Sequence, residues 1–267
     1  MKIKRILLTG DDGYNSIGTR LLAHFFKDKY ELQIAGTKTQ QSGVGGKLSV
    51  TRGGSWGQTM VDGVPALWVS GTPGDAVECA YSLFTKPFDL VISGINLGAN
   101  VAGAIASGTL NAARRSVKLP LAPQAIAISW DTPGEFWFKD HSGKEDISDY
   151  LKHPGKAALK TIKFILKNDL WGCALINVNL PQKSTTKAIF TKFLFHLNEF
   201  YDYPINIDKT TFRYSYPNKH QSVFPKDRLH NDAFALNAGY ISITPCHPDS
   251  LHLTAYRQLK GKTIKLD

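Results

Sequence analysis

The chain has 267 residues, of which 42% are hydrophobic and 20% charged, and a formal net charge of +10. This composition is typical of a globular protein with a full core, and no apolar stretch approaches the roughly 20 residues that span a bilayer. The apolar run after the basic amino terminus is too short for a secretory signal. The positive charge suits an anionic substrate, but no compact basic run with interleaved aromatic residues indicates a specific nucleic-acid partner.

The three cysteines, Cys79, Cys173 and Cys246, are odd in number and lie within apolar segments. This pattern favours reduced thiols over a disulfide framework or a zinc site. We therefore expect a cytoplasmic protein with neither a membrane anchor nor a specific nucleic-acid partner.

In the first half of the chain, buried strand patterns alternate with amphipathic helical patterns. The expected strands are Ile6–Leu8, Tyr30–Ala35, Ala66–Ser70, Asp89–Ser93 and Ala125–Ser129. The expected helices are Ser16–Asp28, Asp75–Phe84 and Thr109–Val117. A further helix over Lys156–Lys167 and a strand over Ala174–Val178 follow. Because strands separated by helices pair in parallel, the pattern predicts an α/β fold with a mostly parallel sheet flanked by helices.

The pattern changes after residue 182. Ile189–Tyr203 and Thr211–Tyr216 alternate apolar and polar residues, as half-exposed antiparallel strands do. We therefore predict an α/β core over 1–182 and a β appendage with a carboxy-terminal arm over 183–267, including a returning strand near 239–245. The segment Asp131–Tyr150 is rich in Gly, Asp, Ser and aromatic residues, and is expected to be a surface excursion.

Two adjacent carboxylates, Asp11 and Asp12, directly follow the first predicted strand in a Gly-rich turn. Open α/β sheets bind their ligands at this end of a strand. Neighbouring carboxylates repel each other, so keeping both ionised requires a cation or strong hydrogen bonding, and a hard divalent metal ion is the simplest solution. The alternative is a structural Asp-Asp-Gly turn that caps the following helix.

Three more loops at predicted strand ends carry polar residues. Ser42 and Asn96 would join Asp11 and Asp12 at one edge of the sheet, and their oxygens suit Mg²⁺ or Mn²⁺. Ser107-Gly108-Thr109 opens a helix, whose amino terminus favours a phosphate group. Each loop alone is more often structural, but the recurrence favours a ligand site. The sequence Gly10–Gly13 does not match a dinucleotide fingerprint, and no Walker A or Gly-x-Ser-x-Gly sequence is present.

At these residues the chain closely resembles the SurE family (survival protein E) of metal-dependent 5′/3′-nucleotidases. The matching segments occur in the family's order along nearly the whole chain: ILLTGDDGYNSIG (6–18), QSGVG (41–45), GTPGD (71–75), DLVISGINLGAN (89–100), SGT (107–109), INVNLP (176–181) and GYISITP (239–245). The resemblance implies a Rossmann-like core, a protruding β-hairpin and a carboxy-terminal arm exchanged between subunits of a homodimer or dimer of dimers.

The resemblance also implies one divalent ion per subunit, Mg²⁺ or Mn²⁺, held by Asp11, Asp12, Ser42 and Asn96. Asn100 and Ser107-Gly108-Thr109 would line the phosphate pocket. The implied reaction is hydrolysis of nucleoside monophosphates to nucleoside and phosphate, and some members of the family also cleave short polyphosphate. Either aspartate could accept the proton of the attacking water.

The chain departs from the family pattern at three places. Gly10 stands where the family usually has Asn, and Ala106 where it usually has an aromatic residue or His. The sequence 111–116 replaces the pattern Gly-Ala-Ala-x-Glu-Gly. The alternative function is therefore a protein that keeps the fold but has lost efficient turnover, and serves as a nucleotide-binding or scaffold protein.

Overall fold

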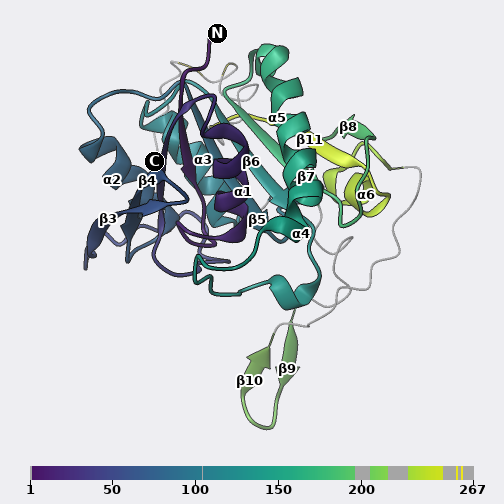
Figure 1. The fold of residues 1–267 in the computed structure, drawn as a ribbon. Helices are drawn as coiled ribbons and strands as arrows, with labels where there is room; N and C mark the ends of the chain where they lie inside the picture. Colours follow the sequence, from purple (N-terminus) through teal and green to yellow (C-terminus); the bar gives the residue numbers. More distant parts are fainter. Residues whose placement is uncertain are drawn as a thin grey trace.

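The computed structural model describes residues 2–103, 105–195, 205–215 and 228–248, together with Arg257 and Lys260. In this part of the chain, nine strands form one sheet in the order β3-β4-β2-β1-β5-β6-β7-β11-β8, with helices on both faces (Figure 1). A separate two-stranded sheet protrudes from the main body. The predicted α/β fold class is confirmed.

The strands of the main sheet are mostly short and buried. Their bounds are β1 Arg5–Thr9, β2 Glu31–Thr37, β3 Trp56–Val61, β4 Val64–Val69, β5 Leu90–Leu97, β6 Ala125–Trp130, β7 Leu175–Leu180, β8 Ala188–Phe190 and β11 Ile241–Cys246. The central strands β1, β2, β4, β5, β6 and β7 all run parallel. Their carboxyl ends therefore meet at one edge of the sheet, where such folds bind ligands.

Helices cover the sheet in two groups. Their bounds are α1 Ile17–Phe26, α2 Pro73–Leu83, α3 Gly108–Lys118, α4 Ser148–Tyr150, α5 Lys156–Lys167 and α6 Asp232–Asn237, with short 3₁₀ or π turns at Gly134–Phe136, Leu151–Gly155 and Asp169–Gly172. Helices α1 and α5 pack against one apolar cluster on one face of the sheet, and α2 and α3 against a second cluster on the other face. A ligand at the carboxyl edge is therefore bounded by α1 on one side and α3 on the other.

Side-chain caps fix where the helices begin. Ser16 and Ser107 each accept a hydrogen bond from the backbone N–H three residues later, at 3.2 and 2.9 Å. Thr72 and Asp75 form a reciprocal capping box around Pro73, which stands in the first turn of α2. Ser, Thr and Asp are preferred at these positions because they satisfy amides that have no partner inside the helix. The caps place the starts of α1 and α3 beside the strand ends.

The region after residue 182 partly differs from the prediction. Strand β8 was expected to pair in antiparallel fashion, but it spans three residues and pairs parallel with β11. Strand β11 pairs antiparallel with β7, so both strands extend the main sheet. Strands β9 (Asn206–Asp208) and β10 (Arg213–Ser215) form the predicted antiparallel hairpin. Residues 196–204 and nearly all of the predicted arm over 247–267 lie outside the described residues.

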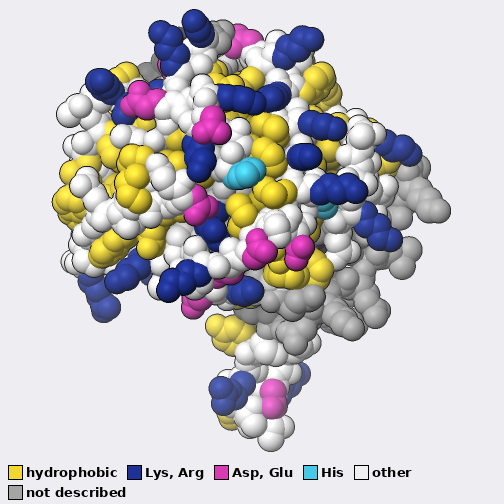
Figure 2. All heavy atoms as spheres, in the orientation of Figure 1, with side chains coloured by type: hydrophobic (Ala, Val, Ile, Leu, Met, Phe, Trp, Pro, Cys, Tyr) yellow, Lys and Arg dark blue, Asp and Glu magenta, His cyan; other side chains and the backbone are white. Residues whose placement is uncertain are grey.

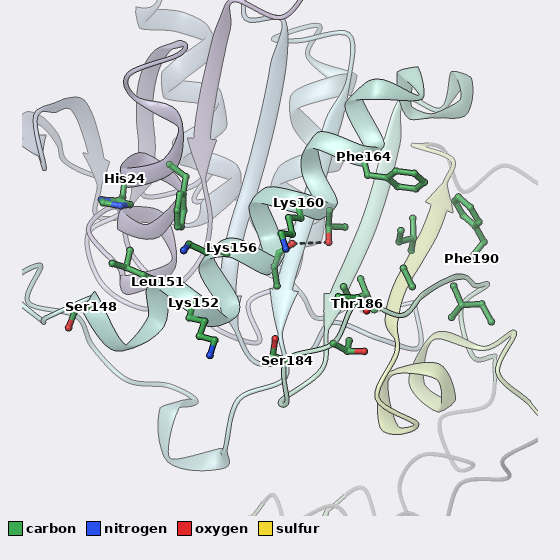
Figure 3. A pocket seen from close by; sticks show the side chains of 18 residues that line it. His24, Ser148, Leu151, Lys152, Lys156, Lys160, Phe164, Ser184, Thr186 and Phe190 are labelled. Atoms are coloured by element: carbon green, nitrogen blue, oxygen red, sulfur yellow. Dashed lines mark hydrogen bonds between the residues drawn. The ribbon is translucent and has the colours of Figure 1, made fainter.

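Lys and Arg side chains are spread over the face drawn in Figure 2, with hydrophobic patches between them. Lys152, which precedes α5, and Lys156 and Lys160 on α5 line a groove of about 1020 Å³ between α5 and the β8–β11 edge (Figure 3). None of the predicted site residues lines this groove. Among the described residues, no helix is both long and apolar enough to cross a membrane.

Candidate metal and phosphate site

Asp11 and Asp12 lie at the carboxyl end of β1, and their side chains are buried, with exposed fractions of 3% and 5%. Asp12 Oδ2 accepts a hydrogen bond from Leu97 N at 2.7 Å, which joins the ends of β1 and β5. The backbone carbonyl of Asp11 accepts a hydrogen bond from Gln41 N at 2.7 Å. The two aspartates are therefore held between the loops that follow β2 and β5.

Asn96 and Thr109 bring two further oxygens to Asp11. The Thr109 hydroxyl donates to the Asp11 carboxylate, and its oxygen lies 3.0 Å from Asn96 Oδ1. Asn96 Nδ2 donates to the carbonyl of Gly98 at 2.7 Å, so Asn96 Oδ1 is the atom that faces Thr109. Three oxygens of different side chains thus share the single hydroxyl proton of Thr109.

The amino terminus of α3 touches Asp11 at Gly108. A Cβ atom built at Gly108 would lie 2.7 Å from both Cβ and Oδ2 of Asp11. Glycine therefore lets the first turn of the helix approach the carboxylate. This turn contains no acidic side chain, so its N–H groups and the positive end of the helix dipole favour an anion beside the aspartates.

The electrostatics of the two aspartates are unusual. Burial raises the pKa of Asp11 above its ordinary value, although hydrogen bonds from Thr109 and Gly108 act in the opposite direction. Burial raises the pKa of Asp12 well above its ordinary value, and repulsion from Asp11 raises it further, against the hydrogen bond from Leu97. Without a cation, the protein surroundings thus oppose the ionisation of both groups.

Ser42 lies in the loop that follows β2. The preceding residue, Gln41, is anchored on the Asp11 carbonyl, and Gly45 N donates to the carbonyl of Ala106 at 2.8 Å. The loop is therefore tied to β1 on one side of Ser42 and to the approach of α3 on the other. Its side chain is half-buried beside this edge of the sheet.

Asn100 belongs to a buried amide network that the sequence analysis did not predict. Its side-chain Nδ2 donates to Ser129 Oγ at 2.9 Å, and its backbone N–H donates to Asn179 Oδ1 at 2.7 Å. Its carbonyl accepts hydrogen bonds from the amides of Asn177 and Asn179, at 2.8 and 3.0 Å. Two Asn residues within the otherwise apolar strand β7 were the sequence signal that could have revealed this network.

Asp232 fixes the chain just beyond Asn100. Its carboxylate is fully buried and accepts hydrogen bonds from Ala102 N at 2.8 Å and from Leu194 N at 2.9 Å. Burial raises the pKa of Asp232, although these backbone bonds oppose the shift. The sequence did not reveal this residue, because a single Asp in the first turn of a six-residue helix resembles an ordinary helix start.

Comparison with known proteins identifies the family. The family model described as "Survival protein SurE" matches residues 6–198. The chain belongs to the SurE family. It is 32% identical to the "5′-nucleotidase SurE" of Maridesulfovibrio salexigens, over 91% of this chain and 93% of that protein. It is 36% identical to the protein of the same name from Methanopyrus kandleri, over 66% of each chain.

The fold of the SurE chain also has a solved counterpart. The crystal structure of the Sure protein from Aquifex aeolicus superposes with a TM-score of 0.71 at 23% sequence identity, covering 96% of this chain and 98% of that one. This likeness concerns the fold. It agrees with the mostly parallel sheet flanked by helices described above.

The oxygen atoms of the SurE site are suited to bind a divalent metal ion. The Asp11 carboxylate, the Asn96 amide oxygen and the Thr109 hydroxyl crowd together with one hydroxyl proton between them, and the buried Asp12 carboxylate is repelled by Asp11. A cation would relieve both this crowding and the unfavourable ionisation, and oxygen donors suit Mg²⁺ or Mn²⁺. Within the described ranges, no group of three or more His, Cys, Asp or Glu side chains is placed to hold a metal ion, so such a centre depends on neutral oxygens for its remaining protein ligands.

The unusual SurE position Gly10 has room for a side chain. The φ angle of Gly10 is not positive. A Cβ atom built there would meet only Gly94 N at 3.5 Å and Gly94 Cα at 3.8 Å. These are ordinary van der Waals contacts. Backbone conformation therefore does not require glycine at position 10.

Proposed function

We propose that this SurE chain is a divalent-metal-dependent nucleotidase that hydrolyses nucleoside monophosphates to nucleoside and phosphate. The observation that carries the proposal is the pair of buried, adjacent carboxylates facing the amino terminus of α3. The printed names of the relatives, 5′-nucleotidase SurE, support the same activity. Some activity on short polyphosphate is compatible with such a site.

In this proposal Asp11, Asp12, Ser42 and Asn96 hold one Mg²⁺ or Mn²⁺ ion per subunit. When bound, such an ion polarises the phosphate and lowers the pKa of a water molecule. The hydrogen bond from Leu97 to Asp12 and the bond from Asn96 to Gly98 keep the two donor groups oriented. One of the two aspartates accepts the proton of the attacking water.

The phosphate lies against Asn100 and the Ser107-Gly108-Thr109 turn. N–H groups at the start of α3 stabilise the charge that develops on the phosphoryl oxygens. Asn177 and Asn179 hold the backbone carbonyl and N–H of Asn100, and Ser129 accepts a hydrogen bond from its side-chain amide. This rigidity matters because small displacements of a binding group lower the rate strongly.

We further propose that the protein acts in the cytoplasm as a homodimer or a dimer of dimers. The apolar residues in the sequence after His247 and the free cysteines are the support for this part. A symmetric exchange of arms between identical chains buries such residues efficiently. A monomeric mass in solution at micromolar protein concentration would contradict the dimer.

The decisive experiment measures phosphate release from a panel of 5′- and 3′-nucleoside monophosphates with added Mg²⁺ or Mn²⁺, and again after chelation. We expect release that requires the ion and that is lost in Asp11→Asn with the fold retained. Asp149→Asn, which changes an exposed aspartate on α4, is the matched control. If the folded protein binds nucleotides but releases no phosphate, the alternative of a nucleotide-binding protein with degraded catalysis holds.

A further inference from the structure

A segment with no role in the proposed phosphate chemistry crosses the carboxyl edge of the sheet. Residues 131–147, called the strap here, leave β6 and run back across the neighbouring strand ends to α1. Asp140 Oδ1 accepts a hydrogen bond from Gln40 N at 3.3 Å, and the Glu145 carbonyl accepts one from Arg20 Nη1 at 2.6 Å. The strap thus touches the loop after β2 and the helix after β1.

Two close approaches extend this contact. A Cβ atom at Gly143 would lie 2.7 Å from Asn15 Nδ2, in the turn that follows the two aspartates. A Cβ atom at Gly98 would lie 3.5 Å from both Cδ1 and Nε1 of Trp137, and 3.8 Å from Asn96 Nδ2. Trp137 is therefore next to the residue that orients Asn96. The strap forms one wall of the candidate site.

The strap lies on the α1 face of the sheet. Its end packs there, because Ile147 and the adjacent Tyr150 contact the apolar cluster beneath α1 and α5. The phosphate-binding turn belongs to α3, on the opposite face. A nucleotide whose phosphate meets α3 can therefore extend its nucleoside across the edge towards the strap.

Trp137 is held in a defined orientation. Its Nε1 donates to the carbonyl of Thr132 at 3.2 Å, and its side chain is half-buried. On the α3 side, the residue before Ser107 is Ala106, which offers no ring to a base. All nucleobases can stack on an aromatic side chain, because every base has a π face.

We propose that Trp137 forms the surface against which the base of a nucleotide substrate stacks. This inference rests on the proposed nucleotidase function and adds the residue that recognises the nucleoside part. The strap then serves binding, whereas the aspartates and α3 serve the phosphate. Trp137 contributes to affinity for nucleotides and contributes little to phosphomonoesters that lack a base.

The test compares AMP with ribose 5-phosphate, which carries the same phosphoryl group without a base. For Trp137→Ala we expect KM for AMP to rise about tenfold, the size of a lost base–aromatic contact. The KM for ribose 5-phosphate and both kcat values should stay unchanged. Trp137→Phe, which keeps a ring, should retain most of the affinity for AMP. Trp56→Ala, which removes a half-exposed Trp on the edge strand β3, is the matched control.

Each other outcome has a distinct meaning. If KM rises equally for AMP and ribose 5-phosphate, Trp137 only supports the strap, and the stacking proposal is wrong. If neither KM changes, the ring does not touch the base. If the wild-type protein hydrolyses neither compound, the proposed function fails, and calorimetric Kd values for AMP in wild type and Trp137→Ala decide the stacking proposal separately.

Discussion

Gly108 lies directly against the carboxylate of Asp11, so the helix that is proposed to bind phosphate touches a residue that is proposed to bind the metal ion. A methyl group at position 108 would approach Oδ2 of Asp11 to 2.7 Å. Real Cβ atoms do not tolerate such a distance, so either the carboxylate or the helix must shift. The two halves of the candidate site are therefore mechanically coupled at this contact.

The first prediction follows from this contact. Gly108→Ala should lower kcat/KM at least tenfold, because it displaces Asp11 or the first turn of α3. The fold should be retained, since Ala favours helices over Gly by up to about 1 kcal/mol. The assay is phosphate release at saturating metal. Gly46→Ala is the control, because the three atoms nearest to a Cβ atom there all belong to Asn111 and lie at ordinary distances of 3.6 Å or more. Full activity of the folded Gly108→Ala protein would refute the coupling.

The second prediction concerns the repulsion between Asp11 and Asp12. Asp12→Asn should raise the Tm of the metal-free protein at pH 7, because it removes a buried charge that burial and Asp11 both disfavour. The same variant should abolish the rise in Tm that Mg²⁺ or Mn²⁺ gives to the wild type. Asp149→Asn should change neither value.

The pH dependence of this effect has a definite sign. The pKa of Asp12 in the folded protein is raised above 3.8. The stability that the protonated side chain contributes to folding is therefore complete below pH 3.8, and it is lost as the pH rises through the folded pKa. The Tm advantage of metal-free Asp12→Asn over the wild type should therefore grow from pH 4 to pH 7. An advantage that shrinks over this interval would contradict the assignment.

The third prediction uses the space at Gly10. Gly10→Asn should raise kcat/KM for nucleoside monophosphates severalfold or more, if the added amide contacts the phosphate or the attacking water in the transition state. A hydrogen bond to a charged group is worth about 1.5–3 kcal/mol, and 1.4 kcal/mol corresponds to about tenfold in rate. Since φ at Gly10 is not positive, the side chain introduces no backbone strain. A folded variant with unchanged or lower kcat/KM on every nucleotide would disprove a lost catalytic contact.

The fourth prediction tests the cap of α2. Burial raises the pKa of Asp75, but hydrogen bonds from Thr72 and Ser49 outweigh it, so the net pKa is lowered. Asp75→Asn should therefore destabilise the protein at pH 7, by about 0.5–2 kcal/mol on the scale of lost helix caps. The lowered pKa means that the contribution is present above 3.8 and is lost as the pH falls. Urea unfolding at pH 7 and pH 3 measures it, and equal losses at both pH values would rule out the carboxylate as its source.

Much of the α/β core could be predicted from the sequence because its strands are buried on both faces. Continuous apolar runs such as Ile6–Leu8 and Ala125–Ser129 then have few alternatives to a parallel strand. The helix starts were predictable within one or two residues, since capping side chains mark them. Strand β3 was missed because Trp56–Val61 contains Gly and polar residues and is mostly exposed at the edge of the sheet.

The later strands were harder to predict, because pairing is a property of two segments and the sequence of one does not determine it. The alternation of apolar and polar residues over Ile189–Tyr203 indicated an antiparallel strand, yet β8 runs parallel to β11. At the site, the Gly-rich loops that follow successive predicted strands indicated that Asp11 and Asn96 lie close together. The support from Asn177 and Asp232 comes from residues distant in sequence, and only the folded chain brings them together.

The neutral amide of Asn96 sets the charge balance of the proposed metal centre. Because its Nδ2 donates to the Gly98 carbonyl, Asn96 presents a neutral oxygen to the Thr109 hydroxyl beside Asp11. An Asp at this position would turn an anionic oxygen towards the Gly98 carbonyl. Two carboxylates balance the charge of one divalent ion, and a third would leave the centre negative. A neutral centre does not repel a phosphate dianion. In the proposed site, the amide at position 96 would therefore let an anionic substrate approach without electrostatic repulsion.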